Sequence, residues 1–228
     1  TEKVNIEKTV TICLNGHNIS LASGKNIIIG SGAAVIIQGD GQQGTDGKVA
    51  GNITAYAGTA LTVENCTVEG QLTAHGSSTV TDSLVTSTKS PAFTVNNQNA
   101  AVKLSGSLFL LTGTPSGSGV ASAVKFGAAD TVKMEGCTVQ GPREGIYFSG
   151  AVREAVIDGC AIQGANKEGI SFYGLEAGNT VTVTNSLVSS EEGNAVSASW
   201  NMDKTAVITL GEGNTVSGRI SLPGNTDE

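Results

Sequence analysis

The sequence predicts an all-β fold: a single-domain, right-handed parallel β-helix solenoid of about nine coils, with three short strands in each coil. A ten-residue phrase recurs along the chain, its apolar residues stand two apart, and Gly or Asn interrupts it at a fixed position. The clearest copies are residues 61–70 (LTVENCTVEG), 132–141 (VKMEGCTVQG), 155–164 (AVIDGCAIQG) and 181–190 (VTVTNSLVSS). Repeats of roughly 20–30 residues are each too small to bury a face alone, so they must stack.

Each repeat contains three strand-forming segments. Val132 and Met134 stand two apart, which is the side-chain period of a strand. The next apolar pair is out of step by one residue at Gly136, where a positive φ can turn the chain through a corner. A third segment follows, as in residues 145–150 (GIYFSG). Stacked leucine-rich repeats are the nearest alternative, but the regular Leu spacing they require is not seen.

A small residue, either Cys or Ser, occupies the same position in successive repeats. We expect it to face inward and to stack coil on coil, because a buried free Cys behaves as a small hydrophobe. Cys13, between two aliphatic residues, is predicted to face outward as a lone thiol. A disulfide between the adjacent-coil cysteines would need side chains that point at each other rather than in parallel. The position is occupied by Cys66, Ser83, Ser107, Cys137, Cys160 and Ser186.

Composition narrows the function classes. The formal net charge is −7 and the pI about 4.8, so no basic stripe is available for nucleic acid. No apolar run has membrane-spanning length, so we expect no membrane insertion. Charged residues make up 14% of the chain, against about 25% usually. A Thr/Ser/Asn/Gly-rich exterior of this type is common on secreted and cell-surface bacterial proteins.

The chain begins at Thr1 without an initiator Met. We therefore expect a mature or excised piece of a larger protein with flanking domains. The β-helix domain is assigned to residues 1–228, with residues 223–228 as a tail or linker.

The repeats, together with the opening segment 10–20 (VTICLNGHNIS), resemble the right-handed parallel β-helix domains of the pectate-lyase-like superfamily. More narrowly, the leading coil is similar to the first coil of β-helix regions in large surface proteins of anaerobic bacteria. The resemblance covers nearly the whole chain and implies the fold. It implies no single activity, because the superfamily contains lyases, hydrolases, tailspikes, adhesins and glycan-binding domains.

The catalytic motifs of those enzymes are not seen. A polygalacturonase-like hydrolase would need clustered aspartates and motifs such as Asp-Asp and Gly-His-Gly, and the nearest match, at residues 16–18, lacks the second Gly. A pectate-lyase-like site would need several carboxylates holding Ca²⁺ beside a base, whereas few outward carboxylates fall in the central strand segments (Glu64, Glu135 and Asp158). We therefore assign no catalytic residue.

The first site candidate is a charged corner. Residues 143–145 (REG), 167–169 (KEG) and 191–193 (EEG) align in the repeat, and their central glutamates, Glu144, Glu168 and Glu192, recur at equal intervals along the chain. These glutamates are predicted to stack on three successive coils. Stacked like charges favour a bound cation such as Ca²⁺ or a neutralising base, which Arg143 and Lys167 could supply. A solvated corner of mixed charge is the alternative.

The second candidate is aromatic. In the strands after that corner, Tyr147 and Tyr173 alternate with inward aliphatic residues, so both should point outward on neighbouring coils; Trp200 follows the equivalent strand one coil later. Together they could stack on sugar rings, with Arg143 and Lys167 alongside for hydroxyls. Packing or capping is the alternative.

These observations predict a non-enzymatic secreted or cell-surface module, acting as an adhesin, a stalk or a polysaccharide-binding domain for a polysaccharide or host glycan. The alternative is a polysaccharide lyase or glycoside hydrolase of the pectate-lyase-like type.

Overall fold

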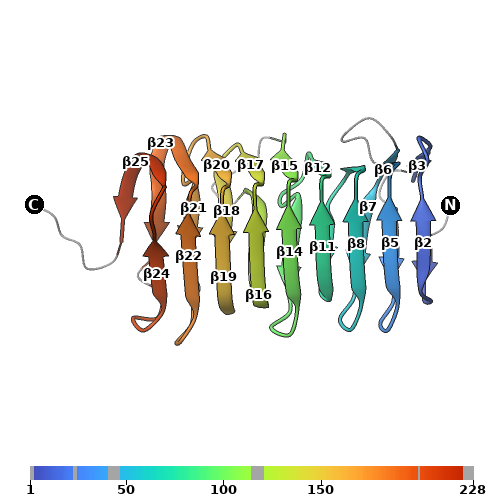
Figure 1. Ribbon diagram of the computed structural model, residues 1–228, viewed down its shortest axis with the longest axis horizontal. Helices are drawn as coiled ribbons and strands as arrows, with labels where there is room; N and C mark the ends of the chain where they lie inside the picture. The colour runs from blue at the N-terminus through green and yellow to red at the C-terminus, as the bar shows by residue number, and fades with distance from the viewer. Residues whose placement is uncertain (1–2, 23–24, 41–46, 114–120, 200, 223–228) are drawn as a thin grey trace, which may run out of the picture.

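The computed structural model describes residues 3–22, 25–40, 47–113, 121–199 and 201–222. Within these ranges the chain advances along a single axis, and its strands stand side by side from the N-terminal to the C-terminal end (Figure 1). The strands pair in parallel with those of the coil before and the coil after, and no helix occurs among the described residues. The predicted tail, residues 223–228, and Trp200 lie outside the described residues.

Each coil contributes to three faces, named in chain order. Face 1 holds nine parallel strands in the described chain, as predicted from the repeats, and these are the upright arrows in Figure 1. They are β2 (Val10–Cys13), β5 (Ala34–Gln38), β8 (Ala60–Glu64), β11 (Ser77–Thr81), β14 (Ala101–Ser105), the second half of β16 (Ser122–Glu135), β19 (Val152–Asp158), β22 (Thr180–Thr184) and β24 (Val207–Leu210).

Faces 2 and 3 are built in the same way from shorter strands. Face 2 consists of β3 (Asn18–Ser20), β6 (Lys48–Ala50), β9 (Thr67–Glu69), β12 (Leu84–Ser87), β15 (Leu108–Leu111), β17 (Thr138–Gly141), β20 (Ala161–Gly164), β23 (Leu187–Ala198) and β25 (Thr215–Ser221). Face 3 consists of β1 (Val4–Ile6), β4 (Asn26–Ile29), β7 (Asn52–Ala55), β10 (Leu72–Ala74), β13 (Phe93–Asn96), the first half of β16, β18 (Glu144–Phe148), β21 (Ile170–Phe172) and the second halves of β23 and β25.

The corner between face 1 and face 2 confirms the predicted role of Gly and Asn. One residue there adopts a positive φ in coil after coil, which shifts the inward side-chain phase by one. Asp82 takes this conformation as well, although the sequence pattern predicted only Gly or Asn. The residues are Asn65 (φ 50°), Asp82 (46°), Gly106 (56°), Gly136 (60°), Gly159 (61°) and Asn185 (49°).

The small residue that follows this corner is buried and bonded, as Ser186 illustrates. Its hydroxyl accepts the backbone N–H of Cys160 in the preceding coil at 3.1 Å and donates to the carbonyl of Thr184 at 2.7 Å. The Cys160 thiol donates in the same way to the carbonyl of Asp158, at 3.3 Å. Ser and Cys are therefore interchangeable because each is small and can both donate and accept a hydrogen bond.

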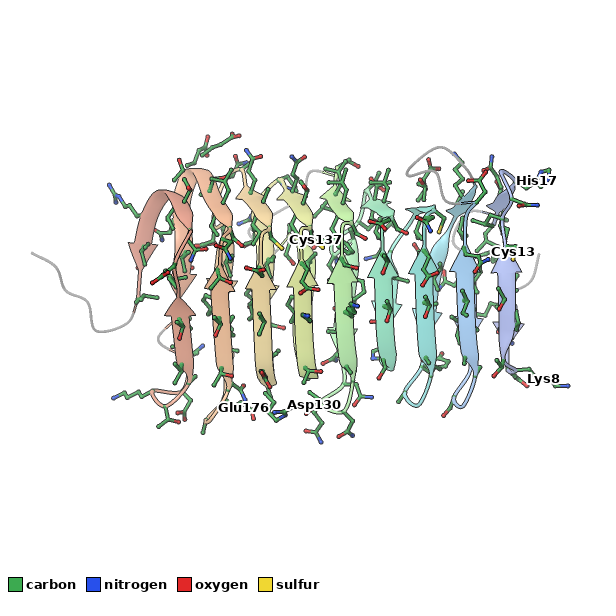
Figure 2. All side chains as sticks on the ribbon, viewed as in Figure 1. Lys8, Cys13, His17, Asp130, Cys137 and Glu176 are labelled. Carbon is green, nitrogen blue, oxygen red and sulfur yellow. The ribbon has the colours of Figure 1, made fainter. Side chains whose placement is uncertain are left out.

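The cysteines behave as predicted. Cys13 is exposed on the first coil, whereas Cys137 is buried (Figure 2). Cys66 and Cys160 are also buried, and all four cysteines are free thiols. Burial raises the pKa of the Cys66 thiol to about 11. The hydrogen bond shared with Cys137, together with burial, raises the pKa of Cys160. The thiols of Cys66 and Cys160 are therefore protonated at neutral pH and serve packing rather than chemistry.

The core is a column of inward-facing aliphatic residues that also holds the contacting rings of Phe93 and Phe109 and a stack of three phenylalanines. Phe126, Phe148 and Phe172 occupy one inward row of face 3 and are fully buried. Both pairs of neighbouring rings have centroids 5.0 Å apart. The coil spacing imposes this stacking, because identical positions lie one strand spacing apart. The stack lies beneath the strands that carry the candidate site.

Candidate functional site

The candidate site lies on the outer surface of face 3, directly outside the phenylalanine stack. One outward row runs through Lys125, Tyr147, Ser171 and Ser197 on four successive coils. Since side chains alternate across a strand, the residues before and after each of these point into the core. The charged corner that precedes the row carries the predicted glutamates.

The two tyrosines come together from neighbouring coils, as predicted, although they are not paired in register. Tyr147 lies opposite Ser171, and Tyr173 follows two residues later, yet the ring centroids are only 6.1 Å apart with a 40° tilt. Tyr173 is 45% exposed and Tyr147 only 8%, so Tyr173 forms the accessible ring. The Nζ of Lys125 lies 5.9 Å from the centroid of the Tyr147 ring. Burial, with the charges of neighbouring groups, raises the pKa of Tyr147.

Glu144 is a buried carboxylate rather than an exposed ligand. The residue is only 2% exposed, and its Oε2 accepts the backbone N–H of Ala121 at 2.8 Å. Its Oε1 lies 3.7 Å from the Nζ of Lys167. A buried carboxylate is tolerated where such partners replace its lost hydration. Glu144 therefore anchors the chain at the start of β16, and Lys167 acts as the neutralising base that the sequence suggested.

Glu168 lies one coil further on and is half-buried. Burial is the main cause that raises its pKa, and the charge of Glu144 acts in the same direction. Lys167 and a hydrogen bond with Ser197 oppose the shift. The two stacked carboxyl groups are thus placed in different environments: one is fixed by an N–H and a lysine, and the other is harder to ionise.

The prediction that Glu192 continues this ladder is wrong. On face 3, Ile170 pairs with Val196. The coil between these two residues is therefore two residues longer than the even spacing of the glutamates implies. Glu192 is thereby moved into the corner, where it is exposed and its N–H donates to the carbonyl of Ala165. Asn194 lies opposite Glu168 instead, and its carbonyl accepts the N–H of Gly169. Among the described residues, no three His, Cys, Asp or Glu side chains are grouped closely enough to hold a metal ion.

Two of the other predicted site residues lie beside Glu144 and Glu168. Arg143 is half-buried at the corner before Glu144, and the side chain of Lys167 is 38% exposed. Trp200, the third predicted aromatic residue, lies outside the described residues.

Sequence reasoning missed a hollow on the same side of the solenoid. It lies at the corner between face 3 and face 1, has a volume of about 590 Å³ and is lined by Tyr56, Ala57, His75, Asn96, Asn97, Gln98 and Ala128. One signal in the sequence could have located it. The step from Cys66 to Ser83 is the shortest between successive small residues of the repeat, so one coil must have unusually short corners.

These coils, corners and inward rows define a right-handed parallel β-helix. A family model described as the right handed beta helix region matches residues 52–210, which is well over half of the chain, and the chain belongs to this family. No curated protein and no solved structure matches the chain. The described residues form no helix of the length and hydrophobicity needed to span a membrane.

Proposed function

We propose that this β-helix is a polysaccharide-binding module of a secreted or cell-surface bacterial protein, and that sugar binds on face 3. The observation that carries the proposal is the ring pair of Tyr147 and Tyr173, 6.1 Å apart, with Lys125 over the inner ring. The exposed Tyr173 ring offers a flat surface to the C–H face of a sugar. Lys125, on the coil before Tyr147, and Lys167 and Ser171, on the coil of Tyr173, offer donors to its hydroxyl or carboxylate groups.

The rigidity of the scaffold supports binding. Tyr147 is held by the strands on either side of it, and its ring is fixed between Lys125 and Tyr173. A preformed aromatic surface loses little conformational entropy when it binds a ligand. The low share of charged residues, 14% of the chain, also suits an adhesin or stalk that binds through a few aromatic side chains.

The test is a polysaccharide array followed by calorimetry with the oligosaccharides that bind, each with Ca²⁺ and with chelator. Tyr173→Ala should weaken binding about tenfold, the effect of losing one well-placed aromatic contact. Leu187→Ala is the matched control, because Leu187 is 46% exposed on face 2 and should have no effect. Unchanged affinity in Tyr173→Ala, or no binding to any glycan, would contradict the proposal. Loss of binding with chelator would show that a cation takes part in binding.

A second candidate function, cleavage of a polysaccharide, is favoured by one observation. Glu168, with its raised pKa, lies beside Glu144, and acid–base chemistry on sugars uses carboxyl groups held in different protonation states. Products should then be detected after incubation for days, and Glu168→Gln should abolish turnover while retaining binding. Binding without product in the wild-type protein would exclude cleavage of the glycan tested.

A further inference from the structure

The hollow at Tyr56 is produced by the shortest coil of the solenoid. The corner between face 3 and face 1 spans residues 56–59 in one coil and residues 97–100 two coils later, but only residues 75–76 in between. A Cβ on Gly76 would clash with the Oγ1 and the backbone of Thr59, so only glycine permits so tight a corner. Two longer corners thus form walls on either side of a two-residue floor, and the space between them is about 590 Å³.

The floor and one wall hold each other in place. The Nδ1 of His75 lies 3.2 Å from the carbonyl oxygen of Asn96, and the side-chain amide of Asn97 donates to the carbonyl of His75. Since a carbonyl can only accept, Nδ1 is the protonated nitrogen in the neutral ring, and Nε2 is left as an acceptor. The imidazole is therefore oriented before any ligand arrives.

The side chains of this hollow have the chemistry that recognises an uncharged, polyhydroxylated ligand. Tyr56 is 48% exposed and forms one wall, and Asn96 and Gln98 present exposed amides from the other. The amides of Asn96 and Gln98 offer both donors and acceptors, and a sugar hydroxyl group can likewise both donate and accept. No Asp, Glu, Lys or Arg among the described residues lines the hollow, so nothing here favours an ion over a neutral sugar.

We propose that this hollow, the Tyr56 notch (Tyr56, His75, Asn96 and Gln98), is a second carbohydrate subsite that takes a neutral hexose unit against the Tyr56 ring. Its volume falls within the range of about 300–1,000 Å³ that is usual for small-molecule sites. The proposal deepens the proposed function, since it assigns a neutral sugar class to face 3, but the notch shares no residue with the Tyr147–Tyr173 pair.

The two subsites have equivalent places in the repeat. Tyr56 and Tyr173 each directly follow a face 3 strand, and the N–H of each donates to a carbonyl of the preceding coil, that of Ile29 and that of Phe148. Five strand pairings separate β7 from β21, or about 24 Å at the usual strand spacing of about 4.8 Å. A short oligosaccharide therefore occupies one subsite at a time.

The test uses neutral trisaccharides of hexoses (cello-, manno- and maltotriose), which are too short to span both subsites, and galacturonate trisaccharide as a charged comparison, titrated into the full chain. At least one neutral trisaccharide should bind, and Tyr56→Ala should weaken it about tenfold. Asn96→Gln and Gln98→Ala should each weaken it severalfold, and Leu187→Ala should leave it unchanged. Backbone amide signals of residues 56, 75 and 96–98 should shift on titration, a readout that general loss of stability would not produce.

Comparison with Tyr173→Ala separates the two proposals. Neutral binding lost in Tyr56→Ala and kept in Tyr173→Ala supports the Tyr56 notch, even if the tyrosine pair binds nothing. Neutral binding lost only in Tyr173→Ala overturns the Tyr56 notch and leaves the proposed function standing. Absence of neutral binding at millimolar ligand also overturns it.

Discussion

Replacing Ser186 by Ala tests why Ser and Cys recur after each corner. Ser186 is 1% exposed, and its hydroxyl is the acceptor for the N–H of Cys160. Alanine fills nearly the same space but leaves that buried N–H without an acceptor. A lost hydrogen bond that orphans a buried group costs about 1–3 kcal/mol. Ser186→Cys should cost about 1 kcal/mol or less, because sulfur can fill the same two bonding roles with weaker bonds.

Ser78 provides a matched control for that substitution. It is 3% exposed and faces the core, but its hydroxyl has no hydrogen-bond partner among the described residues. Burying an unpaired hydroxyl costs about 1–3 kcal/mol, so Ser78→Ala should leave the stability unchanged or raise it. The same substitution is thus expected to lower the stability at Ser186 but not at Ser78, although both serines are buried.

The assay is equilibrium unfolding in urea followed by circular dichroism at 25 °C. The midpoint should fall for Ser186→Ala and stay or rise for Ser78→Ala, with the slope m unchanged in both. Equal losses in the two variants would refute the reasoning, since burial alone would then set the cost. So would Ser186→Cys proving as damaging as Ser186→Ala.

Three further predictions concern the core, the site and the thiols. Phe148→Leu should destabilise more than Phe172→Leu, by about 0.5–1.5 kcal/mol in urea unfolding, because Phe148 contacts two rings and Phe172 one; equal costs would exclude a role for ring stacking. Burial raises the pKa of Glu168, so the folded state holds this proton more tightly than the unfolded state and loses stability as pH rises through the two pKa values. Glu168→Gln should therefore be more stable than the wild type at pH 7 and equal to it below about pH 4, and a gain that persists at low pH would contradict this linkage. A thiol reagent should label Cys13 alone in the folded protein and all four cysteines in denaturant, whereas rapid labelling of a second thiol would show that a buried coil opens.

The repeat pattern was sufficient to predict the architecture. Strand period, the positive-φ corner and the inward small residue are local properties, each readable within one ten-residue phrase such as residues 132–141. Parallel pairing then follows, because a solenoid places like positions next to one another. This is why the buried state of Cys137 and the exposed state of Cys13 were both predicted correctly.

The candidate site was predicted less completely, because it depends on corner lengths. The even spacing of the three glutamates placed Glu192 above Glu168, but two extra corner residues in that coil moved it away. Tyr147 was expected to be exposed, yet the adjacent Tyr173 ring and Lys125 cover it. Side chains that point outward from the solenoid do not follow its repeat. Their neighbours in space therefore cannot be predicted from spacing in the sequence.

The sequence by itself therefore determined the coil, its three faces and which side chains enter the column, because those follow from residue-by-residue alternation and backbone conformation. Only the tertiary structure decided that Glu144 is buried against Ala121 and Lys167, and that one short coil opens the Tyr56 notch. The physical reason is that both depend on how corners of unequal length stack on neighbouring coils. That relation exists between repeats and not within any one of them.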